Sequence, residues 1–154
     1  MSSMAAIRDF LSQKRLAVVG VSRQRMEFSR TLYKQLRSCG YDVVPVNPVA
    51  SELEGQKCFA RVEDINPPVD GAVLMTPARV TTAAVRGCQL AGVKRVWIFG
   101  SGGKKAVDPE VLKICSENDI RLVAGECPLM FLPHSGLIHR GHGFVRKLMG
   151  SFPR

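Results

Sequence analysis

Short runs of apolar residues alternate along the chain with segments whose apolar positions recur three and four residues apart. The first pattern is typical of buried strands and the second of amphipathic helices. Strands are predicted at 16–21, 41–46, 70–75, 95–99 and 121–124, with a small extra strand near 57–59. Helices are predicted over 2–13, 28–39, 80–91 and 109–118, with one helical turn at 62–65.

This alternation of apolar strands with helices is typical of a parallel sheet that is covered on both faces. Right-handed crossovers between the strands then produce a doubly wound arrangement. The expected fold class is therefore α/β, a single Rossmann-like domain with a mostly parallel five-stranded sheet and helices on both faces. Because ligands bind outside the carboxyl ends of the strands in such sheets, the strand tips are the first candidates for a site.

The length of 154 residues favours one domain, 1–154, with a core over about 12–132 and a C-terminal arm over 133–154. A short amphipathic helix is expected in the arm at 144–149. The arm either packs on the domain's own core or forms a surface for a homodimer or a protein partner. No apolar run reaches the ~20 residues that span a bilayer, and the N-terminus lacks the apolar region of a signal peptide, so we expect a cytoplasmic location.

The first strand tip, Gly20-Val21-Ser22, forms a turn that suits phosphate. Backbone N–H groups, a serine hydroxyl and the positive end of the following helix all attract anions. Nearby arginines add charge-assisted contacts; they are Arg23, Arg25 and Arg30. From Gly20 the segment reads G-V-S-R-Q-R, so the second and third glycines of the dinucleotide fingerprint G-x-G-x-x-G are absent. An ordinary NAD is not the expected ligand.

The later strand tips carry small, hydroxyl, amide or proline residues: Asn47-Pro48, Thr76-Pro77, Gly100-Ser101-Gly102-Gly103 and Cys127-Pro128. NAD sites place an acidic residue at the second tip, whereas Asn47 carries no charge and tolerates a neighbouring phosphate; Asn47 also shapes turns before proline. The third tip walls an adenine pocket or simply ends a strand before a helix. Since no tip carries an Asp, Glu or Lys that would serve as base or nucleophile, a binding crevice is favoured over a catalytic site.

Charge, cysteine and histidine content narrow the choice of partners. The net charge of +9 favours polyanions, but a nucleic-acid protein has no recognised motif to support it and few aromatic residues for stacking. The five cysteines lack C-x-x-C spacing and are expected to be reduced, with Cys127 a candidate partner for a ligand thiol. His139 and His142 share a helical spacing without further nearby ligands, so no metal is expected.

Several segments in combination resemble the CoA-binding protein family, whose fold is the nucleotide-binding domain at the start of the succinyl-CoA synthetase alpha chain. The segments are V-V-G-V-S (18–22), G-Y-D-V-V-P-V-N-P (40–48), L-E-G (53–55), V-E-D-I (62–65) and E-C-P (126–128). The resemblance covers about residues 12–132. The synthetase alpha chain has a second domain that carries a phosphorylated histidine, and the present chain resembles the binding half alone.

The resemblance implies a role for each strand tip. The first tip and the following helix start would hold the CoA phosphates, the second tip would line the nucleotide, and the third would flank the adenine. Gly100 and the Cys127-Pro128 tip would border the path of the pantetheine arm. Ser29 stands where the family often has glycine, and it either crowds the phosphate or donates a hydroxyl to it.

The leading hypothesis is a non-catalytic module that binds CoA or acyl-CoA. Such a ligand carries a pyrophosphate and a ribose 3′-phosphate, which suit a basic protein, and binding is expected to weaken for CoA that lacks the 3′-phosphate. The alternative is an NADP-type nucleotide-binding protein or oxidoreductase. Asn47 and the arginines allow that alternative, whereas the missing glycines and the absence of a substrate domain disfavour it.

Overall fold

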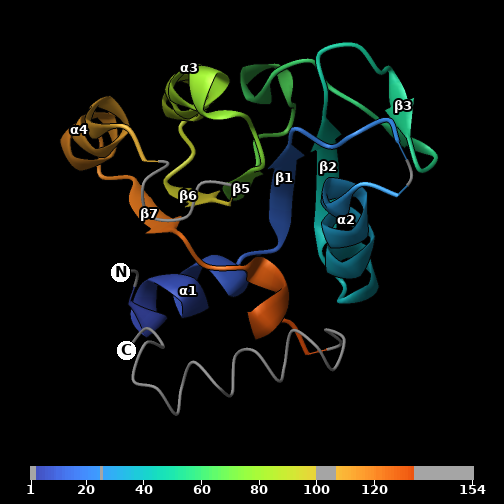
Figure 1. Ribbon diagram of the computed structural model, residues 1–154, viewed down its shortest axis with the longest axis horizontal. Coiled ribbons are helices and arrows are strands. Elements are labelled where there is room, and N and C mark those ends of the chain that lie inside the picture. The colour runs from blue at the N-terminus through green and yellow to red at the C-terminus, as the bar shows by residue number, and fades with distance from the viewer. Residues whose placement is uncertain (1–2, 25, 100–106, 134–154) are drawn as a thin grey trace.

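The computed structural model describes residues 3–24, 26–99 and 107–133. Five strands form one parallel sheet: β1 (Arg15–Val19), β2 (Asp42–Val46), β5 (Gly71–Leu74), β6 (Arg95–Ile98) and β7 (Arg121–Ala124). Their order across the sheet is β2-β1-β5-β6-β7 (Figure 1). The predicted fold class, a doubly wound α/β sheet with five parallel strands, is confirmed.

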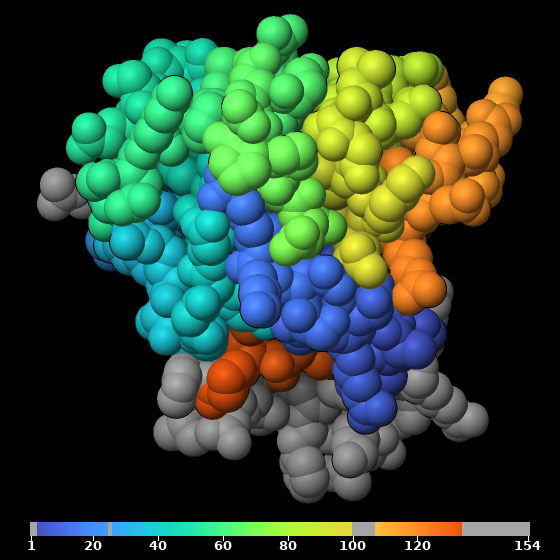
Figure 2. All heavy atoms as spheres, turned by 180° about the vertical axis from the view of Figure 1, so that it is seen from behind, coloured from blue at the N-terminus to red at the C-terminus, as the bar shows by residue number. Residues whose placement is uncertain are grey.

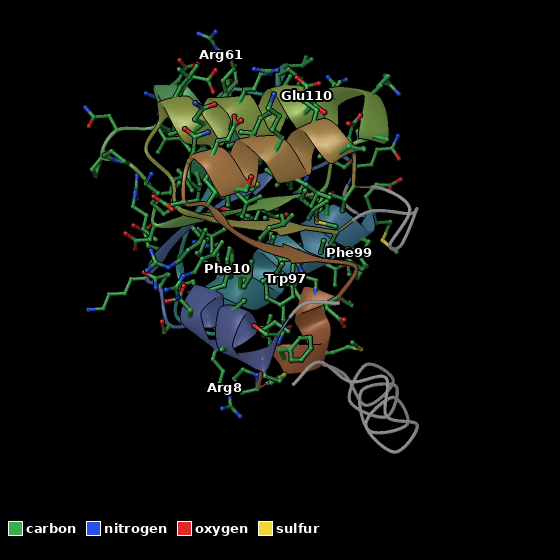
Figure 3. The ribbon with its side chains drawn as sticks, turned by 90° about the vertical axis from the view of Figure 1, so that its left-hand side faces the viewer. Arg8, Phe10, Arg61, Trp97, Phe99 and Glu110 are labelled. Carbon is green, nitrogen blue, oxygen red and sulfur yellow. The ribbon has the colours of Figure 1, made fainter. Side chains whose placement is uncertain are left out.

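Helices cover both faces of this sheet (Figure 3). On one face lie α3 (Ala78–Leu90) and α4 (Pro109–Glu117), and on the other lie α1 (Met4–Leu11) and α2 (Phe28–Ser38). Successive strand residues point to opposite faces, so Ala17 joins the core under α3 while Leu16 and Val18 join the core under α1. Burial on both faces explains why the strand sequences are almost continuously apolar.

Local sequence signals account for the starts of two helices. The Ser3 hydroxyl accepts a hydrogen bond from the N–H of Ala6 at 3.1 Å before α1. The Asp108 carboxylate accepts one from the N–H of Glu110 at 2.8 Å, and Pro109 occupies the first position of α4. These are the preferred cap and first-turn residues of helices, and the predicted start of a helix at residue 109 is confirmed.

The connection between β2 and β5 differs in part from the prediction. The prediction of a single strand at 57–59 is wrong. Instead, β3 (Glu52–Leu53) and β4 (Gln56–Lys57) form a two-stranded antiparallel hairpin. Phe59 makes only one parallel bridge, to Val46. Strands of two residues are too short to leave an alternating apolar pattern, so the hairpin has no periodic signal in the sequence. The helical turn predicted at 62–65 is present as η1 (Val62–Asp64).

Trp97 links β6 by a hydrogen bond to the segment that follows β7. Its side chain is fully buried, and its indole N–H donates to the carbonyl oxygen of Glu126 at 2.8 Å. The ring packs edge-on against Phe10 of α1, with 5.4 Å between ring centroids, beneath the sheet in Figure 3. The chain then enters η3 (Pro128–Phe131) on the same face as α1 and α2.

The helix α1 also closes the edge of the sheet where the strands begin. The Asp9 carboxylate accepts a hydrogen bond from Arg95 Nε at 2.8 Å and lies 3.3 Å from Arg121 Nη1. The bond from Arg95 holds the pKa of Asp9 below its usual value of 3.8. Seen from behind, the N-terminal segment (blue) lies against the yellow and orange segments that contain these arginines (Figure 2). The carboxyl ends of the strands lie at the opposite edge.

Candidate functional site

Gly20 lies at the carboxyl edge of the sheet, where the strand order reverses. The chain passes from β1 to β2 on one side, while β5 lies on the other, and ligands bind at such switch points in doubly wound sheets. Gly20 has a φ of +88°, and a Cβ built on it would lie 2.6 Å from the carbonyl oxygen of Met75. Glycine therefore keeps the tips of β1 and β5 in direct backbone contact.

Two hollows meet at Gly20. The aromatic hollow, of about 400 Å³, belongs to the α2 face of the sheet and is lined by Gly20, Ser22, Glu27, Phe28, Ser29, Met75 and Phe99. The arginine hollow, of about 510 Å³, belongs to the α3 face, and its lining includes Gly20, Pro48, Arg61, Thr76, Pro77, Arg79 and Val80. Both volumes fall in the range of ordinary small-molecule sites. The predicted crevice at the strand tips is therefore a pair of hollows.

The walls of the aromatic hollow are large apolar side chains. The rings of Phe28 and Phe99 lie 5.4 Å apart between centroids and are tilted by 50°. Met75 from the tip of β5 completes this wall, and the exposed Glu27 lies at the start of α2. Phe99 follows β6 at the edge of the sheet (Figure 3). This hollow therefore suits an apolar or weakly polar ligand segment.

The turn after β1 satisfies several of its own polar groups. The Ser29 hydroxyl accepts a hydrogen bond from the N–H of Ser22 at 2.9 Å, and the Ser22 hydroxyl accepts one from the N–H of Gln24 at 3.0 Å. The Gly20 N–H donates to the carbonyl oxygen of Val46 at 3.0 Å. As the acceptor in its bond with Ser22, the Ser29 hydroxyl keeps its proton for a further acceptor. Ser29 thus lies beside the predicted phosphate turn and supports its shape.

Arg30 lies inside the protein and braces the same turn. It is 4% exposed, and its Nη1 donates to the carbonyl oxygens of Ser22 and Arg23, each at 3.2 Å. Its Nη2 pairs with the carboxylate of Glu54 at the tip of the β3–β4 hairpin, and Lys34 Nζ lies 3.5 Å from that carboxylate. The bond from Arg30 holds the pKa of Glu54 below its usual value of 4.5. Direct contact of Arg30 with a ligand stays a prediction.

Asn47 joins the first and second strand tips. Its Nδ2 donates to the carbonyl oxygen of Val21 at 2.8 Å, and its Oδ1 accepts from the N–H groups of Val49 and Ala50 at 2.8 and 2.9 Å. Asn47 therefore shapes the turn before the arginine hollow, and Pro48 lines that hollow. The Val21 side chain is fully buried, so only its backbone is available at the turn.

The third predicted tip also faces the arginine hollow. Thr76 and Pro77 both line it, and Pro77 precedes the first residue of α3. The Thr76 and Thr81 hydroxyl oxygens lie 2.7 Å apart, and the Thr81 hydroxyl donates to the carbonyl oxygen of Pro77 at 3.1 Å. The structure thus brings together the second and third tips, as the sequence predicts, around one hollow.

Two arginines that the sequence analysis did not single out line the arginine hollow. Arg61 precedes η1, donates to both carboxylate oxygens of Asp64 at 3.2 Å, and extends outward on the α3 side (Figure 3). Arg79 is the second residue of α3 and is exposed. A search for cations beside each strand tip would have found Arg79, because it follows Thr76-Pro77 closely. Arg61 carries no such signal.

The remaining predicted site residues either do not line the two hollows or lie outside the described residues. Cys127 and Pro128 lie at the start of η3, and neither is among the described residues that line the two hollows. Burial raises the pKa of the Cys127 thiol. Arg23 is exposed beside the turn. Arg25, Gly100, the three histidines and the helix expected at 144–149 lie outside the described residues.

Two negative findings apply to the part of the chain that the structure describes. Within residues 3–24, 26–99 and 107–133, no helix has both the length and the apolar character that a membrane crossing requires. In the same ranges, no three or more His, Cys, Asp or Glu side chains gather in a way that would hold a metal ion. The cytoplasmic location stays a prediction.

Comparison with known proteins identifies a sequence family. A family model described as a CoA binding domain matches residues 14–133. The ADP-forming acetate–CoA ligase II of Archaeoglobus fulgidus is 29% identical over 148 residues, which is 90% of this chain and 21% of the ligase. The alpha subunit of the ADP-forming acetate–CoA ligase II of Pyrococcus furiosus is 27% identical over 135 residues, 83% of this chain and 30% of the subunit. The chain therefore spans 21% and 30% of the lengths of these two curated relatives.

Solved structures share the fold. A hypothetical protein from Pyrococcus horikoshii superposes with a TM-score of 0.70 at 29% identity, over 80% of this chain and 85% of that protein. The dinucleotide-forming acetyl-coenzyme A synthetase 1 of Candidatus Korarchaeum cryptofilum superposes with a TM-score of 0.65 at 30% identity, over 71% of this chain and 25% of the synthetase. The same fold thus occurs both in a chain of similar length and as a part of a larger enzyme.

Proposed function

Because this chain belongs to the CoA-binding domain family, we propose that it is a non-catalytic module that holds CoA or an acyl-CoA at the carboxyl edge of its parallel sheet. The observation that carries the proposal is the position of Gly20, where bare backbone lies between two hollows of different character. CoA has phosphates in its middle, an adenosine at one end and a pantetheine arm at the other. A ligand of that kind matches the two hollows and their junction.

Each end of CoA has a hollow whose chemistry suits it. The adenosine is assigned to the arginine hollow, where Pro48, Thr76 and Pro77 provide its lining beside two cations. The pantetheine arm is assigned to the aromatic hollow between Phe28 and Phe99. Gly100 and Cys127 would then border the far end of that arm, as the family resemblance implies.

The pyrophosphate is assigned to the junction at Gly20. Its oxygens would accept hydrogen bonds from the backbone of the turn and from the hydroxyl of Ser29, which still has a proton to donate. Arg30 and Asn47 would act from behind this turn, because their polar atoms already hold the carbonyl oxygens of Ser22 and Val21. Arg23 and Arg25 would add charge from the exposed side of the loop.

A binding role without catalysis is supported by the residues at hand. Among the described residues that line the two hollows, none is a His, Cys or Lys, and the two acids, Glu27 and Glu63, are exposed. Acyl transfer requires an activated nucleophile paired with a base. The ligase reaction does not follow from the similarity, because the chain spans 21% of the first of those relatives. A protein partner, docked through residues 133–154, would carry out any reaction on the bound thioester.

Isothermal titration calorimetry of the whole chain tests the proposal with CoA, acetyl-CoA and NADPH. We expect saturable binding of CoA and acetyl-CoA at one site per chain and weaker binding of NADPH. Absence of CoA binding, or tighter binding of NADPH, would overturn the proposal in favour of an NADP-type protein. A hydride-transfer assay with added NADPH checks for the corresponding oxidoreductase activity.

A further inference from the structure

The arginines around the two hollows differ in how far their guanidinium groups are already paired within the protein. Arg30, beside the phosphate turn, is buried and bound to two carbonyl oxygens and to Glu54. Arg61 in the arginine hollow has an exposed side chain that is paired with Asp64. Arg79 lines the same hollow and is exposed, and among the described residues it forms no ion pair. Arg79 is therefore the cation of this hollow that is free to meet an anion.

The surroundings of Arg79 favour an anion as well. It lies in the first turn of α3, a helix of 13 residues whose N-cap residue, Pro77, makes no side-chain cap hydrogen bond. The backbone N–H groups of such a first turn attract negative charge. Glu63 also lines this hollow, but its carboxylate lies beside Gly87: its Oε2 would lie 2.4 Å from a Cβ built on that glycine. Gly87 lies eight positions after Arg79, about 12 Å further along the helix.

We propose that Arg79, assisted by Arg61, recognises the ribose 3′-phosphate of CoA and so determines the preference for CoA over ligands that lack this phosphate. The inference rests on the proposed function, because it takes the adenosine end to occupy the arginine hollow. A phosphate monoester presents oxygens that match the planar guanidinium group in a bidentate contact. The ribose would lie beside Pro48 and Val80, which line the hollow next to the two arginines.

The test compares CoA with 3′-dephospho-CoA in calorimetric titrations of the wild type and of three variants. The wild type is expected to bind CoA about tenfold more tightly than 3′-dephospho-CoA, as for a charge-assisted hydrogen-bonded pair. Arg79→Gln is expected to abolish that preference by weakening CoA alone. Arg61→Gln is expected to reduce it about two- to threefold, because Asp64 already neutralises that cation.

Arg86→Gln is the matched control, because Arg86 is an exposed arginine on the same helix that pairs with Glu110 outside this hollow. It is expected to leave both affinities unchanged. If the wild type binds neither ligand, the proposed function fails and takes this inference with it. If the wild type binds CoA but Arg79→Gln keeps the preference, or weakens both ligands equally, the assignment of Arg79 is wrong and CoA binding stands. Thermal unfolding of each variant verifies that the fold is intact.

Discussion

The aromatic hollow and the arginine hollow meet at one glycine but are built on different principles. Around the turn beside the aromatic hollow, polar groups are bound to one another: Ser29 to Ser22, and Arg30 to Glu54 and two carbonyl oxygens. In the arginine hollow, Arg79 stays exposed at the start of a helix. Closeness to a strand tip in sequence therefore does not separate the two roles: Arg30 braces the turn from inside the protein, while Arg79 presents an exposed cation to its hollow.

The largest effect is expected from Gly20→Ala, because this residue belongs to both hollows. A methyl group there would lie 2.6 Å from the Met75 carbonyl oxygen, on a backbone with a φ of +88°. We expect the free energy of unfolding to fall by about 3 kcal/mol, from the steric and left-handed penalties together. Displacement of the β1 tip from β5 would weaken CoA binding by more than about tenfold. Chemical denaturation and calorimetry measure the two effects.

Gly40→Ala provides the matched control for that substitution. Gly40 has a φ of +94°, but a Cβ built on it meets nothing within 4 Å. It should lose about 1 kcal/mol of stability from backbone conformation alone and leave CoA affinity unchanged. If Gly20→Ala behaves like Gly40→Ala in both measurements, the close approach of the two strand tips has no role in the site.

The strand tips could be predicted from the sequence, whereas the positions of the arginine side chains could not. The strand tips follow from apolar runs that end in glycine, asparagine or threonine. Gly20, Pro48 and Thr76, which the sequence predicts at a crevice, all line the hollows, and their contact with a ligand stays a prediction. Arg30 was expected beside the phosphate because it is close in sequence. The spacing along a helix does not show that its side chain turns toward Glu54, which lies on a hairpin without a periodic pattern. Arg61 depends on how the irregular connection before η1 packs against α3, which no local pattern records.

Glu54→Gln tests the ion pair between Glu54 and the buried Arg30, which braces the turn beside the aromatic hollow. The variant keeps the shape of Glu54 but removes the charge that faces the buried Arg30, so we expect unfolding free energy to fall by about 2 kcal/mol at neutral pH. Since folding lowers the pKa of Glu54 from 4.5, its contribution is present above that value and is lost as the pH falls through the folded pKa. The gap between wild type and variant should therefore narrow in acid.

Denaturant titrations at several pH values between neutral and acid measure this gap. Glu117→Gln is the control, because Glu117 forms an exposed i,i+4 pair with Lys113 at 4.0 Å, and removing such a pair should hardly change stability. A constant gap across the acid range would show that the charge of Glu54 does not support the turn. CoA affinity should fall together with stability, since Arg30 positions the Ser22 carbonyl.

A smaller effect is expected from Ser29→Ala, which decides between the two roles considered for this residue. The hydroxyl accepts from the Ser22 N–H and has a proton left for a phosphate oxygen. Its loss is expected to weaken CoA binding about three- to tenfold, the range of one hydrogen bond. Calorimetry with CoA is the measurement, and Ser38→Ala, an exposed serine near the end of α2, is the control. Tighter binding by Ser29→Ala would mean that the hydroxyl crowds the phosphate instead.

The smallest effect is expected from Phe28→Leu, which tests which end of CoA occupies the aromatic hollow. The substitution keeps an apolar side chain but removes the ring that lies 5.4 Å from Phe99, so the wall of the aromatic hollow loses contact area. Binding of CoA should weaken about two- to threefold, whereas adenosine 3′,5′-bisphosphate, which has no pantetheine arm, should bind as to the wild type. Parallel titrations with both ligands give the result. Equal weakening of both would place the adenosine end near Phe28 and reverse the assignment of the hollows.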